Sequence, residues 1–335
     1  MPRTGIKEGF TKTNLARQYR DKSGMSMATK ALARIMYNEN NLIFTNLEDA
    51  RSTLRAIEGK SGKGVRTIVT HKMPERPRNP YNLPESDERE WLPYKLEGFK
   101  NVGILSDIHV PYHSISALTC AIDHFVKIGI DCLLLNGDSL DFHGLSKYLR
   151  DPNKRSVSDE LDCFAELAKA LQSALKCKII FKLGNHDERV DNYVLRKAPE
   201  LFGLPEAKLQ TLINNRVEGI EFVSDKRVIQ ANALDIIHGH EFAQSIFSPV
   251  NVARGLQLRA KTNAIQGHNH QTSEHTETNL RGEIKTTWST GCLCELHPEY
   301  MPINKWNHGF AFLELDTNGI DFRIENYRIR KGKIL

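Results

Sequence analysis

From about Lys100 onward, short apolar segments alternate with amphipathic ones, and this alternation constrains the fold more than any other feature. The segments NVGILSD, DCLLLNGD and CKIIFKLGNHD have the length and apolar character of buried strands. Between them lie SALTCAIDHFVKIG and SDELDCFAELAKALQSALK, whose apolar residues recur at helical spacing. Buried strands separated by helices are typical of a parallel sheet covered by helices, so the sequence predicts an α/β domain.

The later segments predict a second sheet. Short strand-like runs bounded by turn signals continue to the end of the chain, with little helix expected between them. These runs are EFVSDKRVIQANALDIIHGH, NAIQGHNH, IKTTWSTGC, GFAFLELD and GIDFRIENYRI. We expect them to form a partly antiparallel sheet that faces the first one.

Every apolar strand predicted between residues 102 and 270 ends in side chains that can bind a metal. In chain order these ends are Asp107 with His109, Gly137-Asp138, Gly184-Asn185-His186-Asp187, His238-Gly239-His240 and Gly267-His268-Asn269-His270. Alone, the last group is more typical of a solvated polar strand end, because residues two apart simply share one face of a strand. Ligand sites in α/β sheets lie at the carboxyl ends of strands, so five such groups predict one shared site.

The same five groups resemble the motifs of the calcineurin-like metallophosphoesterases. SDIH, NGDSLD, LGNHD, IHGH and GHNH match in order the patterns D-x-H, G-D-x-x-D, G-N-H-[DE], an H-G or G-H element, and G-H-x-H. The match spans about residues 101–272 and is nearest to the phage and bacterial members. The resemblance implies a four-layer α/β/β/α sandwich with two facing mixed sheets, and a binuclear, metal-dependent phosphoester hydrolase.

The resemblance also implies the metal ligands. One ion would be held by Asp107, His109 and His270, and the other by Asn185, His238 and His268. Asp138 would bridge the two ions. Imidazole combined with carboxylate and amide oxygen suits Mn²⁺, with iron, zinc and nickel as alternatives. Two such ions activate a hydroxide for in-line attack at phosphorus.

Other residues near these motifs are expected to act on the substrate. In the family, the histidine at the position of His186 is a general acid, oriented by the acid at the position of Asp141; the alternative is that His186 only caps a turn. The remaining candidates for substrate contact are His113, His143, Arg189 and His240. Arg189 would pair with phosphate or with Asp191, and His240 competes with His238 as the metal ligand.

Departures from subfamily patterns favour a phosphodiesterase acting on nucleic acid or nucleotides. Phosphoprotein phosphatases of this family carry Arg-Gly where this chain has Phe142 and His143, and that arginine grips the phosphate of a monoester. A phosphomonoesterase of the protein-phosphatase type remains an alternative. A third reading is a DNA-binding or phage-assembly protein in which the phosphoesterase site is secondary.

The N-terminal part is strongly basic. Residues 1–78 contain 16 Lys and Arg against 7 Asp and Glu, a net charge of +9, whereas the remainder carries −4. Residues 1–60 predict three short helices, the last opened by a capping box at Thr45–Glu48. They resemble a helix-turn-helix module, with Arg51 and Arg55 on one face of the last helix as candidates for binding DNA or RNA. The alternative is a packing appendage with solvated arginines.

The remaining predictions concern organisation. We expect a flexible joint at 59–64, a proline-rich and charged linker over 61–98, and a metallophosphoesterase domain over 99–335. A helical insertion at about 188–219 would form a cap over the cleft or serve as scaffold. Six cysteines without framework spacing, no apolar membrane-spanning run and no signal-peptide core predict a cytoplasmic protein, bacterial or in a phage-infected host. Cys292 and Cys294 are predicted as buried strand residues rather than a ligand pair.

Overall fold

The computed structural model describes residues 11–23, 27–58, 80–81, 84, 91–147, 151, 154–242 and 250–335. The chain divides into two compact units, Met1–Glu88 and Arg89–Leu335. The division lies within the predicted linker, and the predicted joint at 59–64 lies outside the described residues. Each unit is considered by itself.

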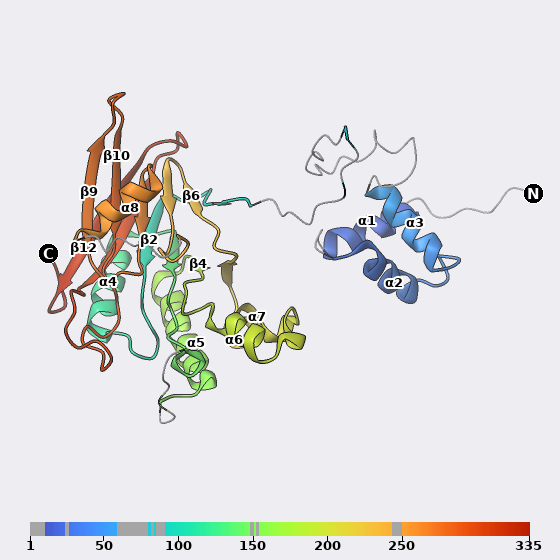
Figure 1. The fold of residues 1–335 in the computed structure, drawn as a ribbon, viewed down its shortest axis with the longest axis horizontal. Coiled ribbons are helices and arrows are strands. Elements are labelled where there is room, and N and C mark those ends of the chain that lie inside the picture. Colours follow the sequence, from blue (N-terminus) through green and yellow to red (C-terminus); the bar gives the residue numbers. More distant parts are fainter. Residues whose placement is uncertain are drawn as a thin grey trace, which may run out of the picture. The chain divides into compact units, whose positions relative to one another are not determined.

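The N-terminal unit contains three helices around a small apolar core (Figure 1). They are α1 (Lys12–Ser23), α2 (Thr29–Glu39) and α3 (Leu47–Ile57). Leu32, Met36 and Leu54 are fully buried where the helices meet. The predicted small all-α region is therefore present.

The start of α3 corrects the predicted capping box. Asn46, not Thr45, is the N-cap, and its side chain accepts a hydrogen bond of 2.8 Å from the backbone N–H of Asp49. The Asp49 carboxylate in turn accepts a 3.0 Å hydrogen bond from the backbone N–H of Thr45. The N-cap is thus shifted by one residue, because asparagine accepts from the first-turn N–H groups as well as threonine does, and Asp49 bonds to the residue before the N-cap.

The C-terminal unit contains a seven-stranded mixed sheet in the order β13-β12-β11-β2-β3-β4-β5. Its central strands pair in parallel, and β11 joins β2 antiparallel. The strands are β2 (Asn101–Leu105), β3 (Cys132–Asn136), β4 (Lys178–Lys182), β5 (Ile220–Val223), β11 (His308–Leu315), β12 (Phe322–Arg330) and β13 (Lys333–Ile334).

A second mixed sheet has six strands in the order β1-β6-β7-β8-β10-β9. Its strands are β1 (Tyr94–Lys95), β6 (Ile229–Ala231), β7 (Leu234–Ile236), β8 (Ala264–Gln266), β9 (Ser273–Thr278) and β10 (Ile284–Ser289). The two sheets pack through a shared apolar core that includes Ile104 and Leu134 of the first sheet and Ile236 and Ile265 of the second.

Helices cover the outer faces of both sheets (Figure 1). Helices α4 (Ile115–Ile128) and α5 (Val157–Leu175) pack on the first sheet, where Phe125 and Phe164 meet Leu133 and Phe181. Helix α8 (Val252–Ala260) covers the second sheet through Leu256. The predicted four-layer α/β/β/α arrangement with two facing mixed sheets is confirmed.

Several details differ from the sequence-based expectation. Strands β5, β11 and β12 join the first sheet rather than the second, because β5 extends it in parallel beside β4 while β11 closes its other side. Helix α8 and strand β9 were not expected, since QLRAK and SEHTET lack a clear apolar period. Tyr94–Lys95, inside the predicted linker, pairs with β6.

The segment after β4 is helical, as the sequence suggests. It contains α6 (Arg189–Lys197), two 3₁₀ turns at Pro199–Leu201 and Pro205–Ala207, and α7 (Leu209–Asn214). Among the described helices of the whole chain, none has the length and apolarity needed to cross a membrane.

Candidate metal centre

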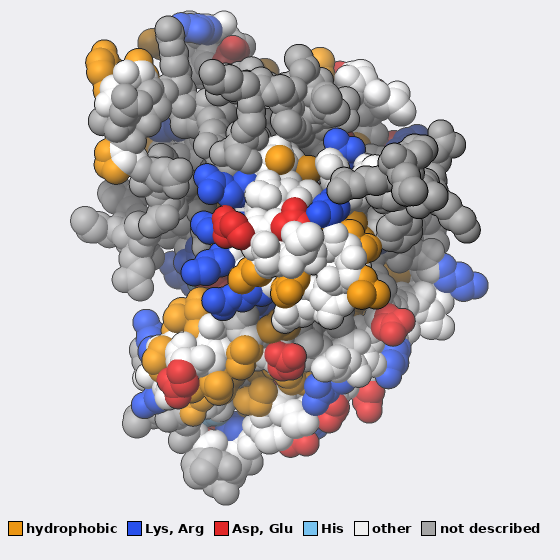
Figure 2. Space-filling model, turned by 90° about the vertical axis from the view of Figure 1, so that its right-hand side faces the viewer, with side chains coloured by type: hydrophobic (Ala, Val, Ile, Leu, Met, Phe, Trp, Pro, Cys, Tyr) orange, Lys and Arg blue, Asp and Glu red, His pale blue; other side chains and the backbone are white. Residues whose placement is uncertain are grey.

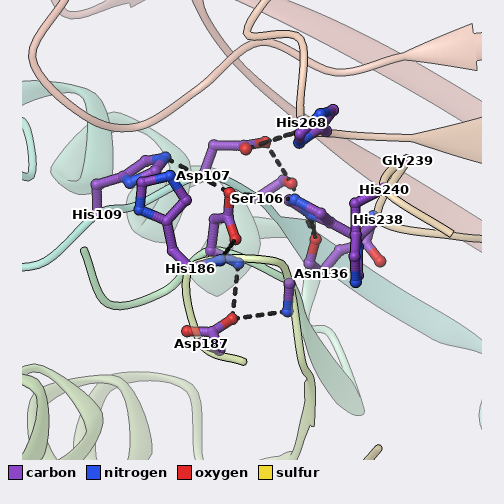
Figure 3. Close-up of polar contacts among 12 residues, drawn as sticks. Ser106, Asp107, His109, Asn136, His186, Asp187, His238, Gly239, His240 and His268 are labelled. Atoms are coloured by element: carbon purple, nitrogen blue, oxygen red, sulfur yellow. Dashed lines mark hydrogen bonds and ion pairs between the residues drawn. The ribbon is translucent and has the colours of Figure 1, made fainter. Parts of the chain in front are cut away.

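The predicted ligands gather where strands of both sheets end (Figure 3). Asp107 follows β2, Asp138 follows β3 and Asn185 follows β4, all in the first sheet. His238 follows β7 and the GHNH segment follows β8, both in the second sheet. The site therefore lies between the two sheets.

The backbone at these strand ends is unusual. The residues Asp107, His109, Asp138, His268 and His270 all have φ between 50° and 66°, in the left-handed region. Aspartate, asparagine and histidine enter this region several times more often than other non-glycine residues. The sharp change of direction turns each side chain back into the space beyond its strand.

One group of side chains forms around Asp107 and His109. His270 Nε2 lies 3.2 Å from Asp107 Oδ1, and His109 Nε2 lies 3.3 Å from His270 Nε2. The same His109 nitrogen lies 3.9 Å from Asp138 Oδ2. These three ligand residues thus point at one small volume beside Asp138.

A second group forms on the other side of Asp138. His238 Nε2 lies 3.2 Å from Asp138 Oδ2, the oxygen that also faces His109. Ligand atoms of Asp138, His238 and His268 all lie within 4.8 Å of one another. Asp138 is therefore placed between two sets of imidazoles, as a bridging carboxylate would be.

Buried polar atoms that lack hydrogen-bond partners indicate whether these residues suit a pair of metal ions. Within the described part of the chain, the buried Asn185 Oδ1 and His268 Nδ1 have no hydrogen-bond partner. Buried polar atoms are normally satisfied, so such orphans call for a ligand. An amide oxygen and imidazole nitrogens beside carboxylates form a donor set that suits a first-row transition metal.

The electrostatics of the cluster favour cations. Burial opposes the charged form of each imidazole, yet Asp138 and Asp107 raise the pKa values of His238 and His270 to about 10. His268 behaves differently: burial and the neighbouring His238 lower its pKa to about 4. The negative potential of two buried aspartates thus attracts positive charge into the centre.

Three glycines allow the ligand-bearing loops to pack against one another without steric clashes. A Cβ on Gly267 would lie 2.6 Å from Asp107 Oδ2 and 2.9 Å from Ser106 Cβ, closer than real contacts. Gly184 packs against Asp138 and Gly137 against the His238 ring in the same way. The glycines of the G-D, G-N-H-D and G-H-N-H motifs are therefore required by packing.

His186 lies beside the ligands and faces Asp141. Its Nδ1 is 3.2 Å from Asp141 Oδ1, and Arg189 Nη2 is 3.1 Å from its Nε2. Burial lowers the pKa of His186, but the charge of Asp138 and the contact with Asp141 outweigh it, so the pKa is raised. Arg189 also donates a 2.7 Å hydrogen bond to the Asp141 carbonyl, whereas no such contact with Asp191 is found among the described residues.

The other residues predicted to contact the substrate lie in different places around the cluster. His143 lines a cavity beside the cluster, and its Nε2 accepts a hydrogen bond from the Asp151 backbone. His240 Nε2 lies 3.3 Å from Glu188 Oε1, and the His240 ring packs edge-on against the His238 ring, at 5.3 Å between centroids (Figure 3). His113 forms an isolated bridge with Cys294 and does not line that cavity.

The predicted nucleic-acid residues lie on α3 in the N-terminal unit. Arg51 Nη1 is 3.2 Å from Glu48 Oε2, and Arg55 is exposed. Figure 2 shows Lys and Arg side chains exposed alongside acidic ones on the face that it presents. The two arginines are available at the surface, and their binding role stays a prediction.

Sequence reasoning missed several residues around the cluster. Asp187 accepts hydrogen bonds from the N–H groups of Asp138, Leu140 and Gly184, and these bonds anchor its loop. The buried Lys182 pairs with Glu241, whose carboxylate accepts from the N–H groups of His238 and Gly239. A lysine inside an apolar strand is the sequence signal that could have revealed this network.

The two late cysteines are buried, as predicted, but they lie outside the named strands. Cys294 has its sulfur within 4.8 Å of ligand atoms of His109 and His270. All six cysteines of the chain are free. The C-x-C spacing therefore marks residues packed against the cluster.

Comparison with known proteins decides the family. A model described as calcineurin-like phosphoesterase matches residues 100–290. The chain belongs to this family. Comparison with curated proteins gave no match.

Solved structures similar to this calcineurin-like phosphoesterase share little sequence. Vps29 from Cryptosporidium parvum has a TM-score of 0.39 at 15% identity, covering 71% of this chain and 96% of that chain. YfcE, a phosphoesterase from E. coli, has a TM-score of 0.34 at 15% identity, covering 63% and 87%. A dimetal phosphatase from Danio rerio has a TM-score of 0.35 at 12% identity, covering 71% and 98%.

Family membership confirms the predicted class. The calcineurin-like phosphoesterase domain spans the region that contains all five motifs, from SDIH to GHNH. The chain is accordingly a metal-dependent phosphoester hydrolase with candidate His and Asp metal ligands.

Proposed function

We propose that this phosphoesterase is a binuclear enzyme that hydrolyses phosphodiesters of nucleotides or nucleic acid. One observation carries the binuclear assignment: Asp138 Oδ2 lies 3.2 Å from His238 Nε2 and 3.9 Å from His109 Nε2. A single carboxylate oxygen between two imidazoles that belong to different ligand groups supports a shared ligand.

Seven side chains would hold the ions, most favourably Mn²⁺. One set is Asp107, His109 and His270, the other is Asn185, His238 and His268, and Asp138 is common to both. When bound, two divalent ions lower the pKa of water and neutralise charge on the phosphoryl oxygens. The protein fixes the geometry through the buried, hydrogen-bonded Asp107, which accepts from Ser106 Oγ and the backbone N–H of His268.

His186 would supply the proton for the leaving oxygen. Asp141 holds its Nδ1, which leaves Nε2 as the nitrogen for the substrate. A histidine whose charged form is favoured by a carboxylate is a suitable general acid near neutral pH. Arg189, which contacts Nε2 here, would move onto a phosphoryl oxygen.

The charges around the site favour a diester over a monoester. Phe142 is fully buried at the position where a phosphate-gripping arginine would stand. Arg189 is the guanidinium that reaches His186 and Asp141 among the described residues. A monoester dianion needs more cationic partners than a diester monoanion, so one arginine matches the diester better.

Metal analysis followed by hydrolysis tests this function. Full-length protein loaded with Mn²⁺ should bind about two ions per chain and hydrolyse bis(p-nitrophenyl) phosphate faster than p-nitrophenyl phosphate. Asp138→Asn should lose turnover with the fold retained, whereas Asp123→Asn, an exposed aspartate on α4, should behave as wild type. Faster monoester hydrolysis would instead support the phosphomonoesterase.

The N-terminal unit would add contacts to a polynucleotide. Arg51 and Arg55 lie four residues apart on α3, so they share one face of the helix. We expect removal of residues 1–88 to weaken oligonucleotide binding and to flatten its salt dependence, since phosphate contacts release counterions. Unchanged binding to single strands, duplex and RNA would favour a packing role for this unit.

A further inference from the structure

A cavity of about 470 Å³ opens directly beside the proposed metal centre. His109, Asp141 and Cys294, which belong to the cluster or contact it, are among the residues that line this cavity. This size is within the range of small-ligand pockets. A group attached to a phosphate at the metal centre would therefore enter this cavity.

Aromatic side chains form much of the cavity wall. Tyr112, Tyr300 and Trp306 line it, and the Tyr300 and Trp306 rings lie 6.4 Å apart between centroids. Trp306 also packs edge-on against the His270 ring, at 4.1 Å between centroids. The wall of the cavity is thus fixed directly to a proposed metal ligand. Rings in such positions offer faces on which a nucleobase can stack.

The charges that line the cavity are mainly acidic. Among the described residues of the lining, Glu295 and Glu299 are accompanied by one lysine, Lys154. The lysine is already engaged, since its Nζ lies 3.8 Å from Glu299 Oε2 and 5.5 Å from the centre of the Tyr112 ring. Carboxylates repel a second phosphate and accept hydrogen bonds from exocyclic amino groups. The cavity therefore suits a neutral, flat group that carries hydrogen-bond donors.

We propose that this cavity binds one terminal nucleobase, so that the enzyme acts on nucleotide diesters or on strand ends. This inference rests on the proposed phosphodiesterase function and names its substrate class. An internal segment of a polynucleotide would bring further phosphates against Glu295 and Glu299. A base at the end of the chain brings none.

Inhibition by matched ligands tests the base-binding site. With Mn²⁺-loaded full-length protein and bis(p-nitrophenyl) phosphate as substrate, AMP should inhibit about 5- to 100-fold more strongly than ribose 5-phosphate, the range expected for base stacking. Tyr300→Leu should reduce this ratio toward one, and Tyr300→Phe, which keeps the ring, should preserve it. Tyr81→Leu, an exposed tyrosine outside the cavity, is the matched control. Equal inhibition by the two ligands overturns the proposal.

A second ligand pair tests the charge argument. Adenosine 3′,5′-bisphosphate should inhibit more weakly than AMP, because its 3′-phosphate would lie against Glu295 and Glu299, and Glu299→Gln should narrow this difference in inhibition. Adenosine 3′,5′-bisphosphate that inhibits as strongly as AMP in the wild type contradicts the exclusion of a second phosphate.

A metal-free measurement separates this inference from the proposed function. Saturation-transfer NMR on the EDTA-treated full chain should show strong transfer to the base protons of adenosine, lost in Tyr300→Leu and kept in Tyr81→Leu. Hydrolysis without adenosine contact would refute the cavity assignment alone. Adenosine contact without hydrolysis of any phosphodiester would refute the proposed function and leave the cavity assignment standing.

Discussion

Gly267→Ala is the sharpest test of how this site is held together. The new Cβ would lie 2.6 Å from Asp107 Oδ2 and 2.9 Å from Ser106 Cβ, and closer still to Ser106 Oγ. Contacts below 3.0 Å are not sustained, so the Asp107 carboxylate has to move by at least 0.4 Å. Ser106 Oγ must also leave its 2.6 Å hydrogen bond to Asp107.

The size of the effect follows from these distances. Catalytic groups must be held to within about 0.5 Å, and a 1 Å displacement costs about 100-fold in rate. We therefore expect kcat/KM to fall about 10-fold or more, with overpacking costing about 1–3 kcal/mol of stability. Phosphodiester hydrolysis, Mn²⁺ content and thermal unfolding measure the three consequences separately.

Two further variants provide a control and a rescue for Gly267→Ala. Gly144→Ala is the control, because among the described residues a Cβ there meets nothing closer than Val157 at 4.0 Å. Ser106→Ala combined with Gly267→Ala removes the nearest obstacle, so part of the lost activity should return. If Gly267→Ala alone keeps wild-type activity and metal content, the close packing of this glycine does not position Asp107.

Three other predictions concern buried charges. Burial, opposed by a hydrogen bond from the Phe142 N–H, raises the pKa of Glu160 from 4.5 to about 7. Between pH 4.5 and about 7 the Glu160 carboxyl therefore keeps its proton in the folded state and loses it in the unfolded state. The free energy of unfolding should fall as pH rises through this window, by about 3 kcal/mol in all. Glu160→Gln should remove this part of the pH dependence, as measured by chemical unfolding. Lys182→Met leaves Glu241 unpaired and should cost about 3–5 kcal/mol, partly recovered by adding Glu241→Gln, as thermal melts would show. Removing the buried partner of Arg20 by Glu58→Gln should destabilise the N-terminal helices, measured by circular dichroism on the full chain.

Much of the fold could be predicted from the sequence, because apolar runs and turn residues determine where individual strands and helices form. The run DCLLLNGD becomes β3 with every residue of the strand buried, and Gly129 ends α4 in the left-handed conformation. The sequence did not allow us to predict which sheet each strand joins. Strand β11 pairs with β2 more than 200 residues away in the chain, and its sequence carries no sign of which edge it joins.

The candidate site was likewise predicted only in part. The motifs identified residues that now lie within hydrogen-bonding distance of each other, such as Asp107 and His270. The aromatic lining of the cavity was not predicted, because Tyr300 and Trp306 belong to an irregular segment with no periodicity. Its position depends on tertiary packing against His270, which sequence spacing does not reveal.

The location of the ligands at the seam between two sheets has a further consequence. Asp107, His109, Asp138 and Asn185 extend from one sheet, whereas His238, His268 and His270 extend from the other. The spacing between these two sets of ligands is therefore set by how the sheets stack. Changes in the inner apolar layer, for example at Trp288, should alter ion affinity from a distance, and bound ions should in turn fasten the two halves of the sandwich together.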